Sequence, residues 1–275
     1  MTEKELKNIW AKPIYLPYLQ PDLTDEMLQD AENQIGNKLP AKLIEILKVQ
    51  NGGYIRYRLG DTPHRLINGI GSYFPSMTDF SWDEEKEYVS FELDGLVPLD
   101  GDGHWYLCLD YRKNKENPKI SYIDVECDEE SVIAENFDCY LKMLKLDTRN
   151  YLVIETDKYI ENIIPKISQI LNIKFEEPNY FNHGYAEYRS KYNDSWIWIT
   201  PNKVPDGFIR KNENRYEEMK AKMELSTLRF PELAETYSFI NLSDKNLETE
   251  IIEKLSKNNI KLRQIEELIR ECPNR

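Results

Sequence analysis

The sequence lacks the features that mark a membrane or secreted protein. It contains no run of about 18 apolar residues, the length that a membrane-spanning helix needs. Its first residues, Met-Thr-Glu-Lys-Glu-Leu-Lys, lack the apolar core and the small-residue cleavage site of a secretory signal. We therefore expect a cytoplasmic protein without a membrane partner.

Histidine and cysteine are scarce as well. The four cysteines show no Cys-x-x-Cys spacing, and the three histidines, His64, His104 and His183, lie far apart in the chain. Zinc sites and disulfide frameworks require such residues at short, regular spacings. We expect no metal site, no disulfide framework and no cofactor.

Familiar catalytic motifs are also missing. The sequence has no G-x-S-x-G elbow, no P-loop and no H-E-x-x-H pair. His104, close to Asp102, is the best candidate for acid–base chemistry, although a histidine at a hairpin end without chemistry fits the same pattern. We predict that the chain is not an enzyme. An activity built in its C-terminal part is the alternative.

The acidic charge is concentrated in the first half of the chain. The net charge is −13, and residues 1–147 contain 28 acidic and 16 basic residues, against 21 and 20 in residues 148–275. A negative field repels nucleic acid and speeds encounter with a basic partner, although acidic residues also serve solubility alone. We expect a basic protein partner and no nucleic acid.

The length of 275 residues predicts two domains. We place them at residues 1–146 and 151–275, with a linker between. Nine of the eleven glycines precede this linker, so the composition changes across it.

Two helices joined by a sharp corner are predicted near the N-terminus. Thr24 caps the first helix, and Gly36 ends it because glycine tolerates the left-handed conformation. Pro40 presets the backbone for the second helix, whose apolar residues recur up to Leu47. The Asn51-Gly52-Gly53 stop then leads into a strand.

The next segment has the pattern of an antiparallel sheet. Strands are predicted over residues 54–59 and 67–73, followed by a meander over residues 88–93, 104–109 and 120–125. The run from Asp100 to Gly103 is a hairpin turn. A helix capped by Ser131 should close this domain, with its apolar stripe at Ile133, Phe137, Tyr140, Leu141 and Leu144.

A candidate partner surface lies in the same region. Trp82 is followed by Asp83, Glu84 and Glu85, and an exposed tryptophan surrounded by acids suits an interface anchor. Asp100 and Asp102, in the hairpin turn, are further acidic candidates. The alternative is an ordinary solvated loop.

The second domain is predicted as a small α+β sandwich. Strands are expected over residues 151–155, 181–189, 196–200 and 237–242, and helices over residues 160–171, 247–255 and 260–270. Pro165 indicates that the first of these helices is kinked or begins late. His183 lies in a tyrosine-rich run that fits packing or a second binding face.

The first domain contains a series of weak motifs in a fixed order and spacing. The series includes the runs 108–111, 118–124 and 133–137. Its main residues are Glu32, Gly36, Leu39, Pro40, Asn51, Gly52, Gly53, Asp110 and Phe137. Over about residues 10–146, this series resembles the SUKH superfamily.

This superfamily includes the fungal Smi/Knr cell-wall assembly regulator and many bacterial immunity proteins. The resemblance implies an α+β fold with a sheet packed on helices, and motif residues that are mainly structural. It also implies a non-enzymatic protein-binding module, in bacteria usually an immunity protein that neutralises a polymorphic toxin, often a nuclease. An intracellular scaffold or regulator is the alternative.

Overall fold

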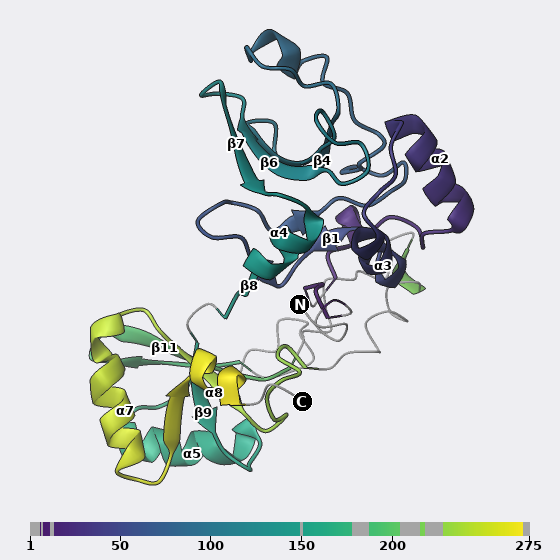
Figure 1. The fold of residues 1–275 in the computed structure, drawn as a ribbon. Coiled ribbons are helices and arrows are strands. Elements are labelled where there is room, and N and C mark those ends of the chain that lie inside the picture. Colours follow the sequence, from purple (N-terminus) through teal and green to yellow (C-terminus); the bar gives the residue numbers. More distant parts are fainter. Residues whose placement is uncertain are drawn as a thin grey trace. The chain divides into compact units, whose positions relative to one another are not determined.

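The computed structural model describes residues 6, 8–11, 14–148, 151–177, 187–203, 215–217 and 228–271. The chain divides into two compact units, Met1–Asp147 and Thr148–Arg275 (Figure 1). Both combine helices with antiparallel sheets, so the predicted α+β class is confirmed. None of the helices in these described ranges has the length and apolar content that crossing a bilayer requires.

The first unit opens with the predicted pair of helices. α2 (Asp25–Ile35) begins after Thr24, whose hydroxyl accepts a backbone hydrogen bond, and ends at Gly36 with a φ of 74°. A helix that ends in this left-handed conformation favours glycine, which has no Cβ. Pro40 directly precedes α3 (Ala41–Val49). The helix–corner–helix prediction is confirmed.

The chain after α3 forms short strands that change partners. The expectation of one strand over residues 54–59 is wrong, because β1 pairs with β3 whereas β2 pairs with β8. The strand expected over residues 67–73 ends after its first residue, because the Ile70 amide binds the Asn51 side chain instead. These strands are β1 (Gly53–Tyr54), β2 (Tyr57–Arg58), β3 (Leu66–Ile67) and β8 (Lys145–Leu146).

A four-stranded antiparallel sheet forms the centre of the first unit, in the order β4-β5-β6-β7. Two predicted strands are confirmed, but the one expected over residues 88–93 is wrong. Gly95, with a φ of 90°, turns the chain just before β4, so the preceding segment lies outside the sheet. The four strands are β4 (Leu96–Gly101), β5 (Trp105–Asp110), β6 (Lys119–Asp124) and β7 (Glu129–Ala134).

The helix that closes this unit begins later than predicted. Ser131 lies in β7, opposite Tyr122, and does not cap a helix. α4 (Phe137–Met143) begins after Asn136, whose Oδ1 accepts a hydrogen bond of 2.9 Å from the Cys139 amide. Ile133 is separated from Phe137 by a helical spacing, which suggested that both lie on one helix. In the structure, Ile133 packs on the core from near the end of β7.

The sheet buries side chains on both faces. Leu107 and Leu109 of β5 belong to the core that includes residues of α3 and α4. Tyr106 and Cys108, which alternate with them, belong to a second cluster with Trp82. Successive residues of a strand point to opposite faces, so β5 supplies both clusters.

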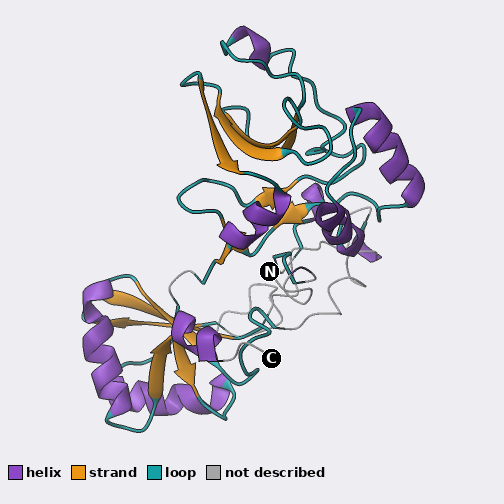
Figure 2. Ribbon diagram, in the orientation of Figure 1, coloured by secondary structure: helices purple, strands orange, loops and turns teal. Residues whose placement is uncertain are grey.

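The second unit is built on a five-stranded antiparallel sheet in the order β10-β11-β12-β9-β13 (Figure 2). Without the edge strand β10, its elements follow the β-α-β-β-α-β order of ferredoxin-like folds. α5 (Ile160–Leu171) and α7 (Glu248–Ser256) contact each other and form one core with the sheet. The strands are β9 (Leu152–Glu155), β10 (Tyr188–Tyr192), β11 (Ser195–Pro201), β12 (Ser238–Leu242) and β13 (Lys261–Gln264).

Two predictions for this unit need correction. The helix expected over residues 260–270 is β13 followed by α8 (Ile265–Glu271), because Leu262 pairs with Ile154 at the sheet edge. α5 begins at Ile160 and contains Pro165, so a late start is wrong. The first strand of the predicted hairpin is β10; residues 181–186 and His183 lie outside the described residues.

Candidate functional site

Trp82, predicted as an exposed anchor, is buried. Its side chain is 8% exposed, and its ring centroid lies 4.9 Å from that of Tyr106. Its Nε1 donates a hydrogen bond of 3.0 Å to the Leu96 carbonyl. The prediction of an exposed tryptophan is therefore wrong. The prediction rested on the acidic residues that follow Trp82, but residues adjacent in sequence can point to opposite sides of the chain.

Asp100, also predicted at the surface, belongs to a buried network. Its Oδ2 accepts hydrogen bonds from His64 Nδ1 and the Arg65 amide, each at 2.8 Å, and from the Leu66 amide at 2.9 Å. His64 is fully buried, and its Nε2 lies 2.8 Å from the Tyr140 hydroxyl. In the neutral ring with the proton on Nδ1, Nδ1 donates to the carboxylate and Nε2 accepts from this hydroxyl.

This network determines which of its groups donate hydrogen bonds, and it connects two secondary-structure elements. Burial, together with the charge of Asp100, raises the pKa of Tyr140 far above its usual value, so the hydroxyl remains a donor. The chain of bonds joins β4 to α4 through His64. The prediction of a surface carboxylate at Asp100 is therefore wrong, and its role is structural.

Asp102 lies where predicted, at an exposed turn, and the structure adds other acids around it. The β4–β5 and β6–β7 turns lie at the same end of the sheet, since the Val125 amide donates a hydrogen bond of 2.8 Å to the His104 carbonyl. Five carboxylates gather here, and all but Asp124 are exposed. We call this group the acidic sheet end: Asp102, Asp124, Glu126, Asp128 and Glu129.

The turns hold these carboxylates in place. Asp102 Oδ1 accepts a hydrogen bond of 3.0 Å from the His104 amide, and Asp124 Oδ1 accepts one of 2.9 Å from the Cys127 amide. The charges act together on nearby groups. Asp124 is the largest cause of the raised pKa of Cys127, to which Glu129 and Glu126 also contribute.

An aromatic pair that the sequence did not single out lies beside these acids. The rings of Trp105 and Tyr122 stack with centroids 5.7 Å apart at an angle of 11°, and both side chains are partly exposed. Burial raises the pKa of Tyr122, and Asp124 and Asp102 raise it further, so the pair lies within the field of the acids. Only the strand register brings these two residues together.

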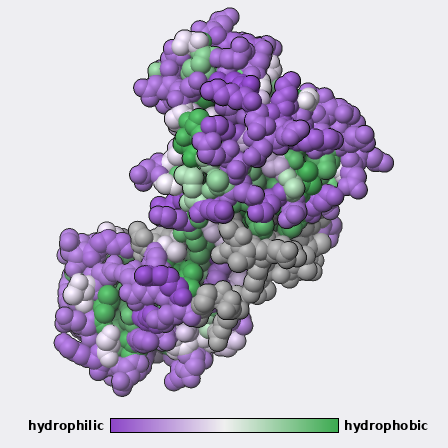
Figure 3. Space-filling model, in the orientation of Figure 1, coloured by the Kyte–Doolittle hydropathy of each residue, from purple (hydrophilic) through white to green (hydrophobic). Residues whose placement is uncertain are grey.

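Of the remaining predicted residues, Glu85 lies near the same end. Asp83 and Glu84 are exposed, and Glu85 begins the short helix η2 (Glu85–Glu87). Glu85 accepts a hydrogen bond from the Tyr106 hydroxyl, whose pKa is raised by burial, by Glu85 and by Asp102. Glu85 and Asp102 therefore lie near one hydroxyl. In the view of Figure 3, hydrophilic residues cover most of the first unit.

The motif residues of the first unit make internal contacts. Glu32 Oε1 accepts a hydrogen bond of 3.0 Å from the Leu39 amide across the corner. The Asn51 side chain donates to the Pro21 and Ile70 carbonyls at 2.7 and 2.8 Å. A Cβ on Gly52 would lie 2.8 Å from the Gly69 backbone nitrogen. Leu39 and Phe137 are buried in the core.

Asp110 pairs with a nearby arginine and is linked to the next strand by a hydrogen bond. Its Oδ2 lies 2.7 Å from Arg112 and accepts a hydrogen bond of 2.8 Å from the Ser121 hydroxyl. Burial opposes ionisation of this carboxyl, but hydrogen bonds from Arg112 and Ser121 prevail and lower its pKa. Arg112 also pairs with Glu130, at 2.7 Å.

The acid–base candidate lacks a catalytic environment. His104 Nδ1 lies 2.7 Å from Glu126 Oε1, but both side chains are about two-thirds exposed, at 67% and 68%. Water screens such a pair strongly. Among the described residues, no three His, Cys, Asp or Glu side chains are grouped to hold a metal ion.

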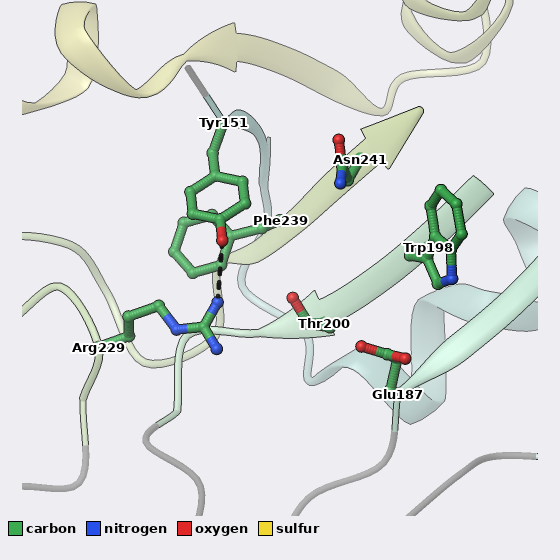
Figure 4. A pocket seen from close by; sticks show the side chains of 7 residues that line it. All are labelled: Tyr151, Glu187, Trp198, Thr200, Arg229, Phe239 and Asn241. Carbon is green, nitrogen blue, oxygen red and sulfur yellow. Dashed lines mark hydrogen bonds between the residues drawn. The ribbon is translucent and has the colours of Figure 1, made fainter. Parts of the chain in front are cut away.

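The second unit has a pocket on the sheet face opposite α5 and α7 (Figure 4). The core residues Ile197 and Ile199 point towards the helices, so Trp198 and Thr200 point the other way. The cavity measures about 350 Å³, which lies in the range of small-molecule sites. Its lining residues are Tyr151, Glu187, Trp198, Thr200, Arg229, Phe239 and Asn241.

A buried asparagine positions the basic side of the pocket. Asn202 is fully buried, and its side chain accepts a hydrogen bond of 2.9 Å from the Phe230 amide and donates one of 3.0 Å to the Phe230 carbonyl. Arg229, the neighbouring residue, is thereby held beside Tyr151, whose hydroxyl accepts a hydrogen bond of 3.4 Å from it. The sequence gave no signal for this site beyond the alternation of polar and apolar residues in β11.

Comparison with known proteins finds a match for one of the two units. The SMI1 / KNR4 family (SUKH-1) model matches residues 22–143, which contain α2, α3, the four-stranded sheet and α4. No family match covers the second unit. The chain matches no curated protein and no solved structure. The resemblance carried by the motif series is thus confirmed over the matched residues, where the first unit is similar to the SUKH-1 family.

Proposed function

We propose that the first unit binds a basic protein through the acidic sheet end, and that the chain is an immunity protein that neutralises a cognate toxin. The observation that carries this proposal is the convergence of five carboxylates from two adjacent turns beside the Trp105–Tyr122 pair. The match of residues 22–143 to the SMI1 / KNR4 family (SUKH-1) model supports it. The mechanism is binding alone, without a catalytic step.

The charge of the surface indicates its partner. Exposed acids attract a basic surface over a distance and raise the association rate, while contributing less to final affinity. The stacked rings of Trp105 and Tyr122 offer a flat face on which a partner's arginine or lysine can make a cation–π contact. A nuclease carries basic residues where it holds phosphates, so it is the class of toxin that this surface fits best.

The proposal is tested by charge-matched variants in the full chain. The partner is first captured from the source organism, and its association rate is then measured by stopped flow at low and high salt. Asp102→Asn, Glu126→Gln and Glu129→Gln together should lower the rate about 10-fold at low salt and flatten its salt dependence. The control variant, Glu26→Gln, Asp30→Asn and Glu45→Gln, removes the same charge from exposed sites on α2 and α3.

Equal effects of both triple variants would show that net charge alone acts and would remove the acidic sheet end as the site. Toxin neutralisation is measured separately, by growth of cells that express the captured partner with and without this chain. A single partner whose toxicity the chain suppresses supports immunity. Several non-toxic partners would instead support the scaffold function.

A further inference from the structure

An arginine on the open face of the second unit's sheet contacts both a tryptophan ring and a carboxylate. The guanidinium of Arg189 lies 5.2 Å from the centroid of the Trp196 ring, and its Nε donates a hydrogen bond of 2.6 Å to Glu176 Oε2. A guanidinium is flat and carries its N–H groups in a fork, so one such group can stack on a ring and bind a carboxylate at the same time. The protein itself therefore shows how a tryptophan of β11 is paired with a cation.

Trp198, two residues further along β11, has a different environment. It lines the pocket together with Glu187, which directly precedes β10. In the described part of the chain, no cation lies over the Trp198 ring, and the Glu187 carboxylate makes no hydrogen bond or ion pair. Figure 4 shows these two side chains towards one side of the pocket and Arg229 towards the other. The pocket thus offers an aromatic face and a carboxylate with two available acceptor oxygens.

The arginine of the pocket is engaged within the protein. Arg229 donates a hydrogen bond of 3.4 Å to the Tyr151 hydroxyl, its guanidinium lies 5.9 Å from the Tyr151 ring centroid, and it makes a further contact besides. Among the described residues that line the pocket, Glu187 is therefore the charged group without a partner in the fold. A cation is the class of ligand that pairs with such a carboxylate.

Two neutral groups of the pocket add hydrogen-bonding capacity. The Thr200 hydroxyl makes no hydrogen bond within the described ranges, so it can accept one from an N–H group. Asn241 lies opposite Trp198 on β12, and its Oδ1 accepts a hydrogen bond of 3.0 Å from the Leu242 amide, which leaves its amide nitrogen as a donor. A guanidinium has no acceptor, so this donor suits a carbonyl elsewhere on the ligand.

We propose that this pocket binds a guanidinium group, with its N–H fork on the Glu187 carboxylate and its plane against the Trp198 ring. An ammonium group matches the charge, but it is compact and strongly hydrated and has no flat face for the indole. A urea group has the flat face and lacks the charge. The guanidinium can belong to an arginine of a polypeptide, whose backbone carbonyl suits Asn241, or to a free alkylguanidine.

The probes are small molecules titrated into the full chain by isothermal calorimetry. Nα-acetyl-L-arginine amide should bind at one site with a Kd below about 1 mM. Nα-acetyl-L-lysine amide keeps the charge without the plane, and Nα-acetyl-L-citrulline amide keeps the plane without the charge, so each should bind at least about 10-fold more weakly.

A fourth probe, n-butylguanidine, separates the two sources of the guanidinium because it lacks the carbonyl. Weaker binding than that of the arginine probe supports an arginine of a polypeptide. Equal or tighter binding supports a free alkylguanidine at the same site.

Glu187→Gln tests the carboxylate. This variant should bind the arginine probe about 10-fold more weakly than the wild type and should no longer prefer it over the citrulline probe. The matched control is Glu253→Gln, which neutralises an exposed carboxylate on α7 and should bind as the wild type does. Trp198→Leu removes the ring, so it should weaken binding of the arginine probe and of n-butylguanidine alike. The thermal midpoint of each variant shows that its fold is retained.

Three results with the arginine probe would overturn the proposal: no binding to the wild type, binding equal to that of the citrulline probe, or an unchanged preference in Glu187→Gln. Guanosine is the competitor to include, because a guanine base also carries adjacent N–H groups on a flat ring. Tighter binding of guanosine, in competition with the arginine probe, would overturn the proposal as well. None of these measurements depends on a toxin partner, so the pocket and the proposed function stand or fall separately.

Discussion

The two units differ in what their polar side chains do. In the first unit, buried groups such as Asp100 and His64 find partners within the fold, and a group of mostly exposed carboxylates lies at the acidic sheet end. In the second unit, Glu187 and Thr200 face a pocket without a partner among the described residues. Satisfied polar residues report on folding, whereas unsatisfied ones in a cavity point to a ligand.

Of the variants considered, Asp100→Ala should cause the largest loss of stability. It leaves His64 and three backbone amides without their acceptor, so we expect a loss of about 3 to 5 kcal/mol in the stability of the first unit. Glu187→Ala removes a carboxylate that has no partner among the described residues, so it should change stability by about 0.5 kcal/mol or less. Segment-resolved hydrogen exchange measures both units in one sample. Similar losses in the two variants would contradict the contrast.

Trp82→Ala compares a core tryptophan with one at the pocket. Trp82 fills the second cluster of the first unit, so its truncation should cost about 3 kcal/mol. Trp198→Ala, on the partly exposed pocket face, should cost about 1 kcal/mol. Urea midpoints of the two variants test this order. A Trp82→Ala protein of normal stability that failed to bind its partner would restore Trp82 as an interface residue.

The glycines of the first unit provide a third test. A Cβ on Gly101 would lie 2.3 Å from the Tyr106 ring and 2.7 Å from the Trp105 carbonyl oxygen. We expect Gly101→Ala to cost about 1 to 3 kcal/mol, seen as a lower thermal midpoint. Gly36→Ala meets no atom within 4 Å but keeps a φ of 74°, so it should cost about 1 kcal/mol from backbone strain alone. The reverse order would show that the hairpin adapts easily.

Acidic pH should weaken the first unit through Asp110. Its pKa is lowered in the folded state, so the folded chain holds fewer protons there than the unfolded chain. This contribution is complete above the ordinary aspartate pKa of about 3.9 and is lost as the pH falls through the lower folded value. Urea unfolding at about pH 5 and about pH 3 should show the loss. Asp110→Asn should be less stable at pH 5 and should lose less on acidification.

Local patterns predicted most of the helices and the central strands. Thr24, Gly36 and Pro40 act within a few residues of their own positions, so the helix ends could be derived from sequence. Trp105 and Tyr122 meet only through the register of β5 and β6, which local patterns do not specify. The pocket needs Asn202 to hold a segment 28 residues further along, and no periodicity reports such a contact.

The errors have a common physical origin. Trp82 and Asp100 stand in acidic, turn-rich stretches, but tertiary contacts bury them. Apolar spacing predicts one helix that begins at Ser131 and another over residues 260–270, although β7 and β13, which contain the first residues of these segments, each pair with a strand. Pairing partners distant in the chain decide both outcomes. Local sequence patterns therefore could not predict which of these residues are buried or which segments pair as strands.

The edges of the four-stranded sheet determine how a partner can attach. On β4, the Leu96 carbonyl accepts from Trp82, and the Pro98 and Leu99 carbonyls accept from Asn68. On β7, the first two residues are exposed glutamates, the kind of residue that discourages a further strand. The outer carbonyls of β4 are therefore engaged, and the glutamates of β7 disfavour an added strand, so this sheet favours recognition through side chains over extension by a partner strand. The same arrangement protects this unit from edge-to-edge aggregation.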